Sequence, residues 1–245
     1  MLCLTAALQI SVARADRYEL LVYSDDLPGK GESEFEELLS VAKPRDISAF
    51  PGPTVWQSHT EVNYGLGKGW EIGVEGHATA SGTSRKFGGL AVEVEYVDEH
   101  DEARGFYWGI RADIGRQASY YEDDWGSAID VNPILGYRNS GFHLVLNPSL
   151  EVPLGGAKSS LSLQPSAKAA WQIPDRSEVG FEYFGDWGSL RQQFSSPQRN
   201  QTLYLVWDGQ GTWGHFNVGM GKSIRTSAGT PDNWVLKLGV QVELD

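Results

Sequence analysis

The segment Trp70-Glu71-Ile72-Gly73-Val74-Glu75-Gly76-His77-Ala78-Thr79-Ala80 decides the fold, because its character changes at every second residue. The even-numbered residues are apolar or small, and most odd-numbered residues are polar. Side chains of a β-strand point alternately to its two faces, whereas a helix repeats every 3.6 residues. The segment therefore predicts a strand with one apolar and one polar face.

The same pattern recurs along the chain, with Gly, Asp, Asn, Ser or Pro between the repeats, as in strands joined by turns. It predicts strands at residues 55–66, 70–80, 90–96, 106–114, 129–137, 142–152, 161–173, 179–187, 202–207, 215–223 and 234–244. A bacterial single-chain barrel has an even number of strands. One more strand is therefore expected within residues 17–43.

Two stretches can supply that strand, residues 18–23 and residues 35–41. The second also fits a helix start, because Ser33 and Glu36 have the spacing of a capping box. We predict an all-β fold, an antiparallel transmembrane β-barrel of 12 strands, with 10 or 14 strands as alternatives.

The predicted links alternate in length, which indicates an orientation. Short links follow residues 66, 137, 173 and 208, and longer polar links surround residues 81–85, 118–126, 186–200 and 225–232. Short turns of outer-membrane barrels face the periplasm and long loops face the exterior. Residues 98–104 form an exception, a charged link of medium length on the short side.

Aromatic residues gather on the apolar faces near the short links, as in the girdle of an outer-membrane barrel. The predicted girdle consists of Tyr64, Trp70, Tyr96, Trp108, Tyr137, Trp171 and Trp207, accompanied by Phe106, Phe142 and Phe181. A soluble sandwich or lipocalin-like barrel also alternates, but it points its apolar faces inward. That class remains an alternative at this point.

The start of the chain predicts export. Residues 1–15 contain a short apolar run before Ala13-Arg14-Ala15, which is typical of a signal peptide cleaved ahead of Asp16. Residues 16–245 are expected to form a single outer-membrane β-barrel domain. The only cysteine is Cys3, so that domain can hold neither a disulfide nor a thiolate metal site.

Charge and hydropathy narrow the expected partners. The net charge of −12 argues against nucleic acid as a partner. No later segment has the roughly 18 consecutive apolar residues of a transmembrane helix. The partners expected are outer-membrane lipid of a Gram-negative bacterium, the barrel assembly machinery and small-molecule solutes.

The polar faces predict a charged lumen. Its expected lining comprises Glu71, Glu75, Glu93, Glu95, Arg111, Asp113, Lys168 and Lys237. Counting all inward positions, ten acids (Glu61, Glu71, Glu75, Glu93, Glu95, Asp113, Asp130, Glu151, Glu182 and Glu243) face three bases, Arg111, Lys168 and Lys237. Any open pore should therefore prefer cations or neutral solutes.

Neither a metal nor catalysis is expected from these residues. Glu71, Glu75 and His77 share a face and could hold a hard cation, but pairing with the inward bases is favoured. No cofactor is expected. A nucleophile two residues after a histidine would suggest an outer-membrane hydrolase, yet this position holds Glu61, Thr79, Val145 or Asn217. The sequence predicts a protein that is not an enzyme.

The segments Tyr64-Gly65-Leu66-Gly67-Lys68-Gly69-Trp70-Glu71-Ile72-Gly73-Val74 and Asn132-Pro133-Ile134-Leu135-Gly136-Tyr137 carry a family likeness. Over roughly residues 55–185 the chain resembles the phenol-degradation MetA-pathway family of outer-membrane β-barrel proteins. The resemblance implies a transporter-like barrel for small solutes, aromatic ones among them, and supplies no catalytic residue. The ending Val242-Glu243-Leu244-Asp245 departs from the usual barrel terminus, which is aromatic.

The sequence leaves three functions open. The first is a passive channel or transporter for small solutes. The second is a non-conducting structural or envelope-interaction barrel, and the third is a soluble periplasmic β-protein.

Overall fold

The computed structural model describes residues 21–43, 52–99, 104–117, 126–154, 161–174, 177–190, 200–225 and 234–244. The signal peptide expected at residues 1–15 lies outside them. The strands are β1 (Ser33–Lys43), β2 (Val55–Gly67), β3 (Trp70–Ser81), β4 (Ser84–Val97), β5 (Gly105–Gln117), β6 (Gly126–Asn139), β7 (Phe142–Pro153), β8 (Ser162–Ile173), β9 (Ser177–Asp186), β10 (Gly188–Ser189), β11 (Asn200–Gly211), β12 (Gly214–Arg225) and β13 (Trp234–Leu244).

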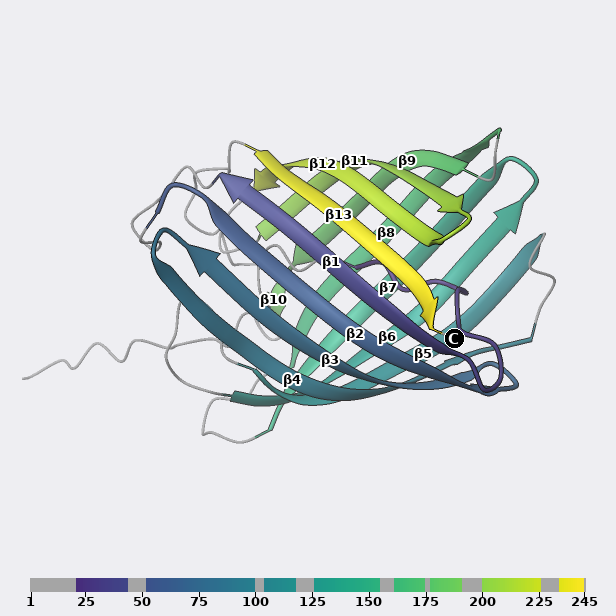
Figure 1. Cartoon of the computed structure of the whole chain (residues 1–245), viewed down its shortest axis with the longest axis horizontal. Coiled ribbons are helices and arrows are strands. Elements are labelled where there is room, and N and C mark those ends of the chain that lie inside the picture. Colours follow the sequence, from purple (N-terminus) through teal and green to yellow (C-terminus); the bar gives the residue numbers. More distant parts are fainter. Residues whose placement is uncertain are drawn as a thin grey trace, which may run out of the picture.

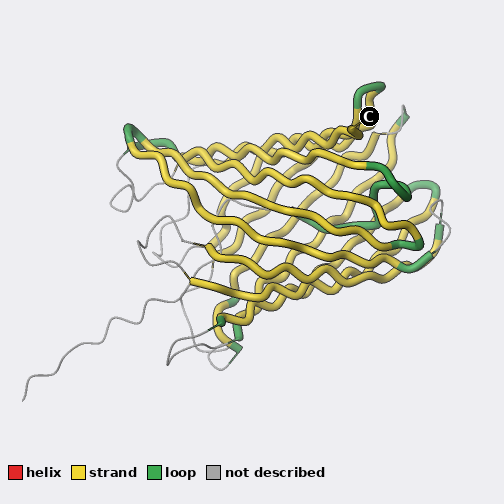
Figure 2. Tube along the Cα trace, turned by 60° about the horizontal axis from the view of Figure 1, so that its bottom comes forward, coloured by secondary structure: helices red, strands yellow, loops and turns green. Residues whose placement is uncertain are grey.

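Twelve long antiparallel strands close into a barrel (Figures 1 and 2). Each pairs with its neighbours in the chain, β8 pairs with β9, and β9 pairs with β11. Strand β1 closes the circle by pairing with β13 from Ser33↔Leu244 to Lys43↔Trp234. The two residues of β10 pair with β8 alone. In the described ranges no helix is long and apolar enough to cross a membrane.

Strand β1 settles the ambiguity within residues 17–43. The expectation of a strand at residues 35–41 is confirmed, and so is the total of twelve. The helix start at Ser33 is wrong, because β2 and β13 flank this segment and take up its backbone hydrogen bonds on both sides. Of the other candidate, residues 18–20 lie outside the described residues and residues 21–23 form no strand.

The barrel has an apolar outside and a polar inside. Large apolar side chains are exposed on every wall, such as Val92 at 58%, Leu205 at 54% and Met220 at 62%. Acids on the opposite parity are buried, such as Glu61 at 1% and Glu93 at 2%. A soluble barrel would bury its apolar faces instead. The outer surface is therefore that of a protein embedded in lipid, and the soluble alternative does not fit.

Aromatic side chains of the outer surface touch one another near the short links. Trp70 and Tyr96 have ring centroids 4.8 Å apart, and Tyr96 and Trp108 have centroids 5.5 Å apart. Further contacts join Phe106 with Tyr137, Phe142 with Trp171, Trp171 with Phe181, and Trp207 with Phe216. Tyr64, Trp171 and Trp207 are each nearly half exposed.

The predicted short links, the start of β1 and the end of β13 lie at the same end of the barrel, called here the short-link end. Ser33, the first residue of β1, pairs with Leu244 and with Tyr64, beside the turn of Gly67, Lys68 and Gly69. All three turn residues have positive φ, and a Cβ on Gly69 would lie 1.9 Å from the carbonyl oxygen of Val97. Only glycine fits that position without strain.

One link is shorter than the sequence predicted. A longer polar link was expected around residues 81–85, but β3 and β4 are joined by Gly82 and Thr83 alone. Ser81 pairs with Ser84, and the polar residues after it belong to β4. These residues are polar because they lie at the rim of the barrel, where the strand pair ends. Their polarity therefore reflects this position at the rim and not a loop.

Three prolines interrupt the wall formed by β6, β7 and β8. The pairing of β6 with β7 runs from Ala128 to Val131 and resumes only at Leu135, so it skips Pro133 opposite Pro148. Pro148 in turn faces Pro165 of β8. Proline has no N–H to donate, which explains the gap in the ladder.

Candidate functional site

Residues 21–27, called here the stopper, lie inside the barrel ahead of β1 (Figure 1). Val22 packs against two apolar clusters on different walls. One cluster includes Val55, Tyr204 and Val235, and the other includes Tyr107, Ile134 and Val145. Tyr23 and Leu27 pack against the second cluster as well. The stopper therefore contacts one wall built from β1, β2, β9, β11 and β13, and a second wall built from β4 to β7.

Tyr23 is held by its backbone and by its ring. Its N–H donates to Oδ1 of Asn147 at 3.1 Å, and Nδ2 of Asn147 donates to its carbonyl oxygen at 3.0 Å. The guanidinium of Arg111 lies 4.1 Å from the ring centroid, a cation–π contact. Burial raises the pKa of the Tyr23 hydroxyl above its ordinary range, so the phenol stays neutral and adds no negative charge.

A salt bridge adds a further anchor for the stopper. Nη2 of Arg138, on β6, lies 2.8 Å from Oδ1 of Asp25. The same Nη2 lies 3.3 Å from Nε2 of His143, which contacts the Tyr107 hydroxyl at 2.9 Å. Arg111, Arg138 and Asn147, which hold Tyr23 and Asp25, thus come from β5, β6 and β7.

Arg111 is the centre of an acidic cluster on β2, β3, β4 and β5. It is 2% exposed, and its Nη2 lies 2.9 Å from Oε1 of Glu61 and 2.8 Å from Oε2 of Glu75. Glu93 contacts the same nitrogen. A buried guanidinium is tolerated where carboxylates surround it in this way.

Carboxylates also face one another across neighbouring strands. The register pairs are Glu36↔Glu61, Glu61↔Glu75, Glu71↔Glu95, Glu93↔Asp113, Asp113↔Asp130 and Asp130↔Glu151. Like charges directly opposite each other destabilise a sheet. Inside a barrel they are tolerated when protons or cations lie between them.

The opposite wall carries a separate, more balanced network. Nζ of Lys168 lies 3.4 Å from Glu178 and 3.2 Å from Asp208, and Lys237 pairs with Glu182. Lys168 belongs to β8, far in the barrel order from the acids around Arg111, whereas Lys237 belongs to β13, which lies next to β1, and pairs with Glu182 of β9. The interior therefore has an acidic wall and a nearly neutral wall.

A cavity of about 690 Å³ lies between the stopper and the walls. Its lining holds ten carboxylates, on Asp25, Asp26, Glu34, Glu36, Glu61, Glu71, Glu95, Glu178, Glu182 and Asp208. It holds four permanent cations, on Arg111, Arg138, Lys168 and Lys237. Within the described ranges the cavity is thus strongly acidic.

The structure places the predicted lumen residues in two groups. Glu71, Glu75, Glu93, Glu95, Arg111 and Asp113 are buried on one wall, whereas buried Lys237 and half-buried Lys168 belong to the other. Glu243, counted as inward, is exposed at the end of β13. Glu151 is buried and pairs with Gln164 rather than with a base.

Sequence reasoning missed several interior residues. Glu34 and Glu36 were missed because β1 had an ambiguous pattern, and Tyr23 and Asp25 because the stopper has no periodic pattern. His59 opposite His77 was also missed. A signal existed for that pair, because both residues are equidistant from Lys68, the middle of the turn between β2 and β3.

Comparisons with known proteins agree on the architecture. No protein-family profile and no curated protein sequence matches the chain. Among solved structures, the COG4313 outer membrane channel from Pseudomonas putida F1 is similar with a TM-score of 0.60 and 9% identity, over 96% of this chain and 100% of that one. LpxR from Salmonella typhimurium has a TM-score of 0.49 and 9% identity, over 85% and 99%.

The translocator domain of autotransporter NalP from Neisseria meningitidis has a TM-score of 0.48 and 10% identity, over 90% of this chain and 91% of that one. At such identities the likeness concerns the fold alone. The closed barrel, its apolar outer surface and the likeness to the COG4313 channel agree: the chain has the fold of an outer-membrane β-barrel.

Proposed function

We propose that the protein is an outer-membrane channel that passively passes small neutral or cationic solutes, and that the stopper must shift before they pass. The acidic cavity carries this proposal, with its ten carboxylates and four permanent cations. A wall of one charge sign within a low-dielectric barrel focuses the field and concentrates the opposite ion. The family resemblance makes small aromatic solutes the first neutral compounds to test.

Reversal potentials of the purified full-length barrel in a planar bilayer test the selectivity. The informative variant is Glu71→Gln with Glu95→Gln, because both line the cavity and neither is one of the three carboxylates ion-paired with Arg111. The matched control is Glu32→Gln with Glu99→Gln, which removes the same charge from exposed positions.

We expect cation preference in the wild type and the control, and a smaller preference in the cavity variant. High salt should weaken the preference through screening. Anion preference that is equal in all three proteins would contradict the proposal.

A non-conducting barrel is the second candidate, and the stopper favours it because the segment fills part of the interior. The combined change of Val22→Ser, Tyr23→Ser and Leu27→Ser removes its apolar anchors. A channel should conduct more often after this change. Lack of conductance in both proteins would favour the non-conducting barrel instead.

A further inference from the structure

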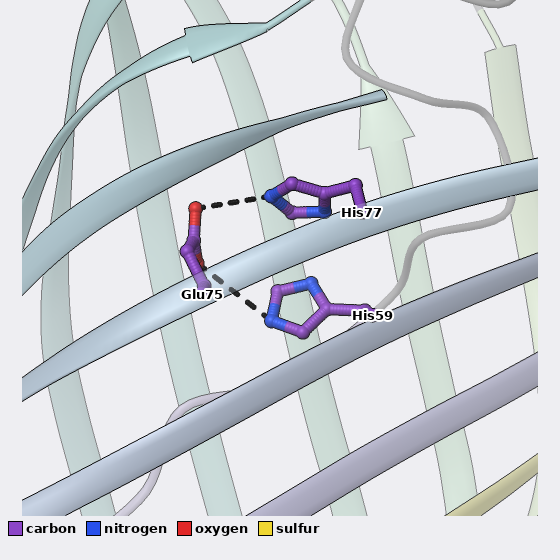
Figure 3. Close-up of side chains that lie close together, drawn as sticks. All are labelled: His59, Glu75 and His77. Carbon is purple, nitrogen blue, oxygen red and sulfur yellow. Dashed lines mark hydrogen bonds and ion pairs between the residues drawn. The ribbon is translucent and has the colours of Figure 1, made fainter. Parts of the chain in front are cut away.

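Two imidazoles and a carboxylate meet inside the barrel on neighbouring strands (Figure 3). His59 of β2 faces His77 of β3 in register, and Glu75 lies on the same face of β3. Their exposed fractions are 3%, 8% and 3%. Burial of such titratable groups costs free energy unless hydrogen bonds, ion pairs or a bound metal compensate for the lost water.

Both histidines present Nε2 to the same carboxylate. Nε2 of His77 lies 3.1 Å from Oε1 of Glu75, and Nε2 of His59 lies 3.7 Å from Oε2. One ligand atom from each residue lies within 4.8 Å of the other two. In a tetrahedral zinc site with bonds of about 2.0–2.1 Å, ligand atoms are roughly 3.3–3.4 Å apart. One ion could therefore bridge the three side chains after small shifts.

Glu61 lies beside the trio, but its Oε1 already lies 2.9 Å from Nη2 of Arg111. Its Oε1 lies 2.5 Å from Nε2 of His59. A set of two imidazoles and one carboxylate suits Zn²⁺ and other first-row divalent ions. Calcium and magnesium prefer oxygen ligands alone. The ligand set therefore selects the class of metal.

The neighbouring trio of Glu61, Glu75 and Glu93 is a different kind of site. The Arg111 guanidinium already contacts all three carboxylates. Arg111 bonds to Oε2 of Glu75, whereas Oε1 faces His77. Arg111 can therefore orient Glu75 as an outer-sphere partner while the other oxygen binds an ion.

The local backbone provides room beside His77. The pairing of β3 with β4 shifts register between His77 and Ala78, which places Gly88 and Gly89 opposite His77. A Cβ on Gly88 would lie 3.2 Å from the Cβ of His77. Such bulges often aim a side chain at a site.

We propose that His59, Glu75 and His77 bind one divalent first-row transition-metal ion, with a water molecule in the fourth position. Zn²⁺ is the probe. The ion would join β2 to β3 inside the barrel and balance part of the acidic wall. The site does not depend on conduction, so its failure and the failure of the channel proposal are separate results.

Isothermal titration of tag-free, chelator-treated, folded barrel with Zn²⁺ tests the site. We expect one ion per chain, and Ca²⁺ at the same concentration should not compete. His59→Asn and His77→Asn should each weaken binding roughly tenfold or more, since even outer-sphere partners contribute that much. His215→Asn is the matched control, because His215 is a half-exposed histidine that pairs with Asp26, outside the cluster.

Co²⁺ gives a second readout, because four-coordinate cobalt absorbs visible light strongly and six-coordinate cobalt does not. This spectrum should appear in the wild type and the control and disappear in the double variant His59→Asn with His77→Asn. Circular dichroism verifies that each variant is folded. Absence of Zn²⁺ binding by the folded wild type, or equal binding by the folded double variant, would overturn the proposal.

Discussion

Arg111→Met is the sharpest test of the interior, because it keeps a long apolar stem and removes the guanidinium. Three carboxylates, on Glu61, Glu75 and Glu93, lose their shared partner. Removing one member of a buried ion pair typically costs about 3–5 kcal/mol, because the remaining charge is left uncompensated. The lost cation–π contact with Tyr23 adds about 0.5–2 kcal/mol.

The free energy of unfolding can be measured with guanidinium chloride in lipid vesicles, followed by fluorescence of the tryptophans. Arg116→Met is the matched control, since Arg116 is exposed near the end of the same strand. Near the membrane interface such a substitution changes the free energy of unfolding by about 0–1 kcal/mol. Arg111→Lys keeps the charge but not the fork of donors, so an intermediate loss is expected. If Arg111→Met costs no more than the control, the carboxylates do not depend on the guanidinium and the reasoning is refuted.

Three further predictions concern other parts of the molecule. Asn147→Leu removes two hydrogen bonds to the stopper, each worth about 1 kcal/mol, so bilayer recordings should show opening more often by roughly thirtyfold; unchanged opening would contradict this role. Gly136→Ala should destabilise the barrel by about 1–3 kcal/mol in vesicle unfolding, because its Cβ would lie 1.8 Å from the ring of Tyr107, and a neutral effect would show that the ring moves freely. Thr83→Cys should react with an impermeant thiol reagent on intact cells and Lys68→Cys should not, and the reverse labelling would invert the orientation.

Alternation predicted most of the fold because each strand has one face in lipid and the other inside the barrel. Strand β1 was less certain, since Glu36 and Glu37 are adjacent acids on opposite faces of it. The outward Glu37 is accepted because its carboxylate receives a hydrogen bond from the Thr60 hydroxyl at 2.5 Å. A local pattern cannot reveal such a cross-strand partner.

The stopper could not be predicted, because its anchors come from distant parts of the chain. Tyr23 bonds with Asn147 at a separation of 124 residues, and Asp25 pairs with Arg138 at a separation of 113. Contacts of this kind depend on closure of the barrel and leave no periodic signal. The pairing within the histidine cluster could have been predicted, since the turn centred on Lys68 determines which residues of β2 and β3 face each other.

The stopper is joined to β1 by a turn at the short-link end, and none of its own residues belongs to a strand. The chain reverses at Gly31, whose φ is 85°, and Gly31 donates to the carbonyl oxygen of Gly65 at 2.8 Å, at the short-link end. From there residues 21–27 go inward, while β1 pairs with β2 and β13. Withdrawal of the stopper would therefore break its own contacts and no strand pairing.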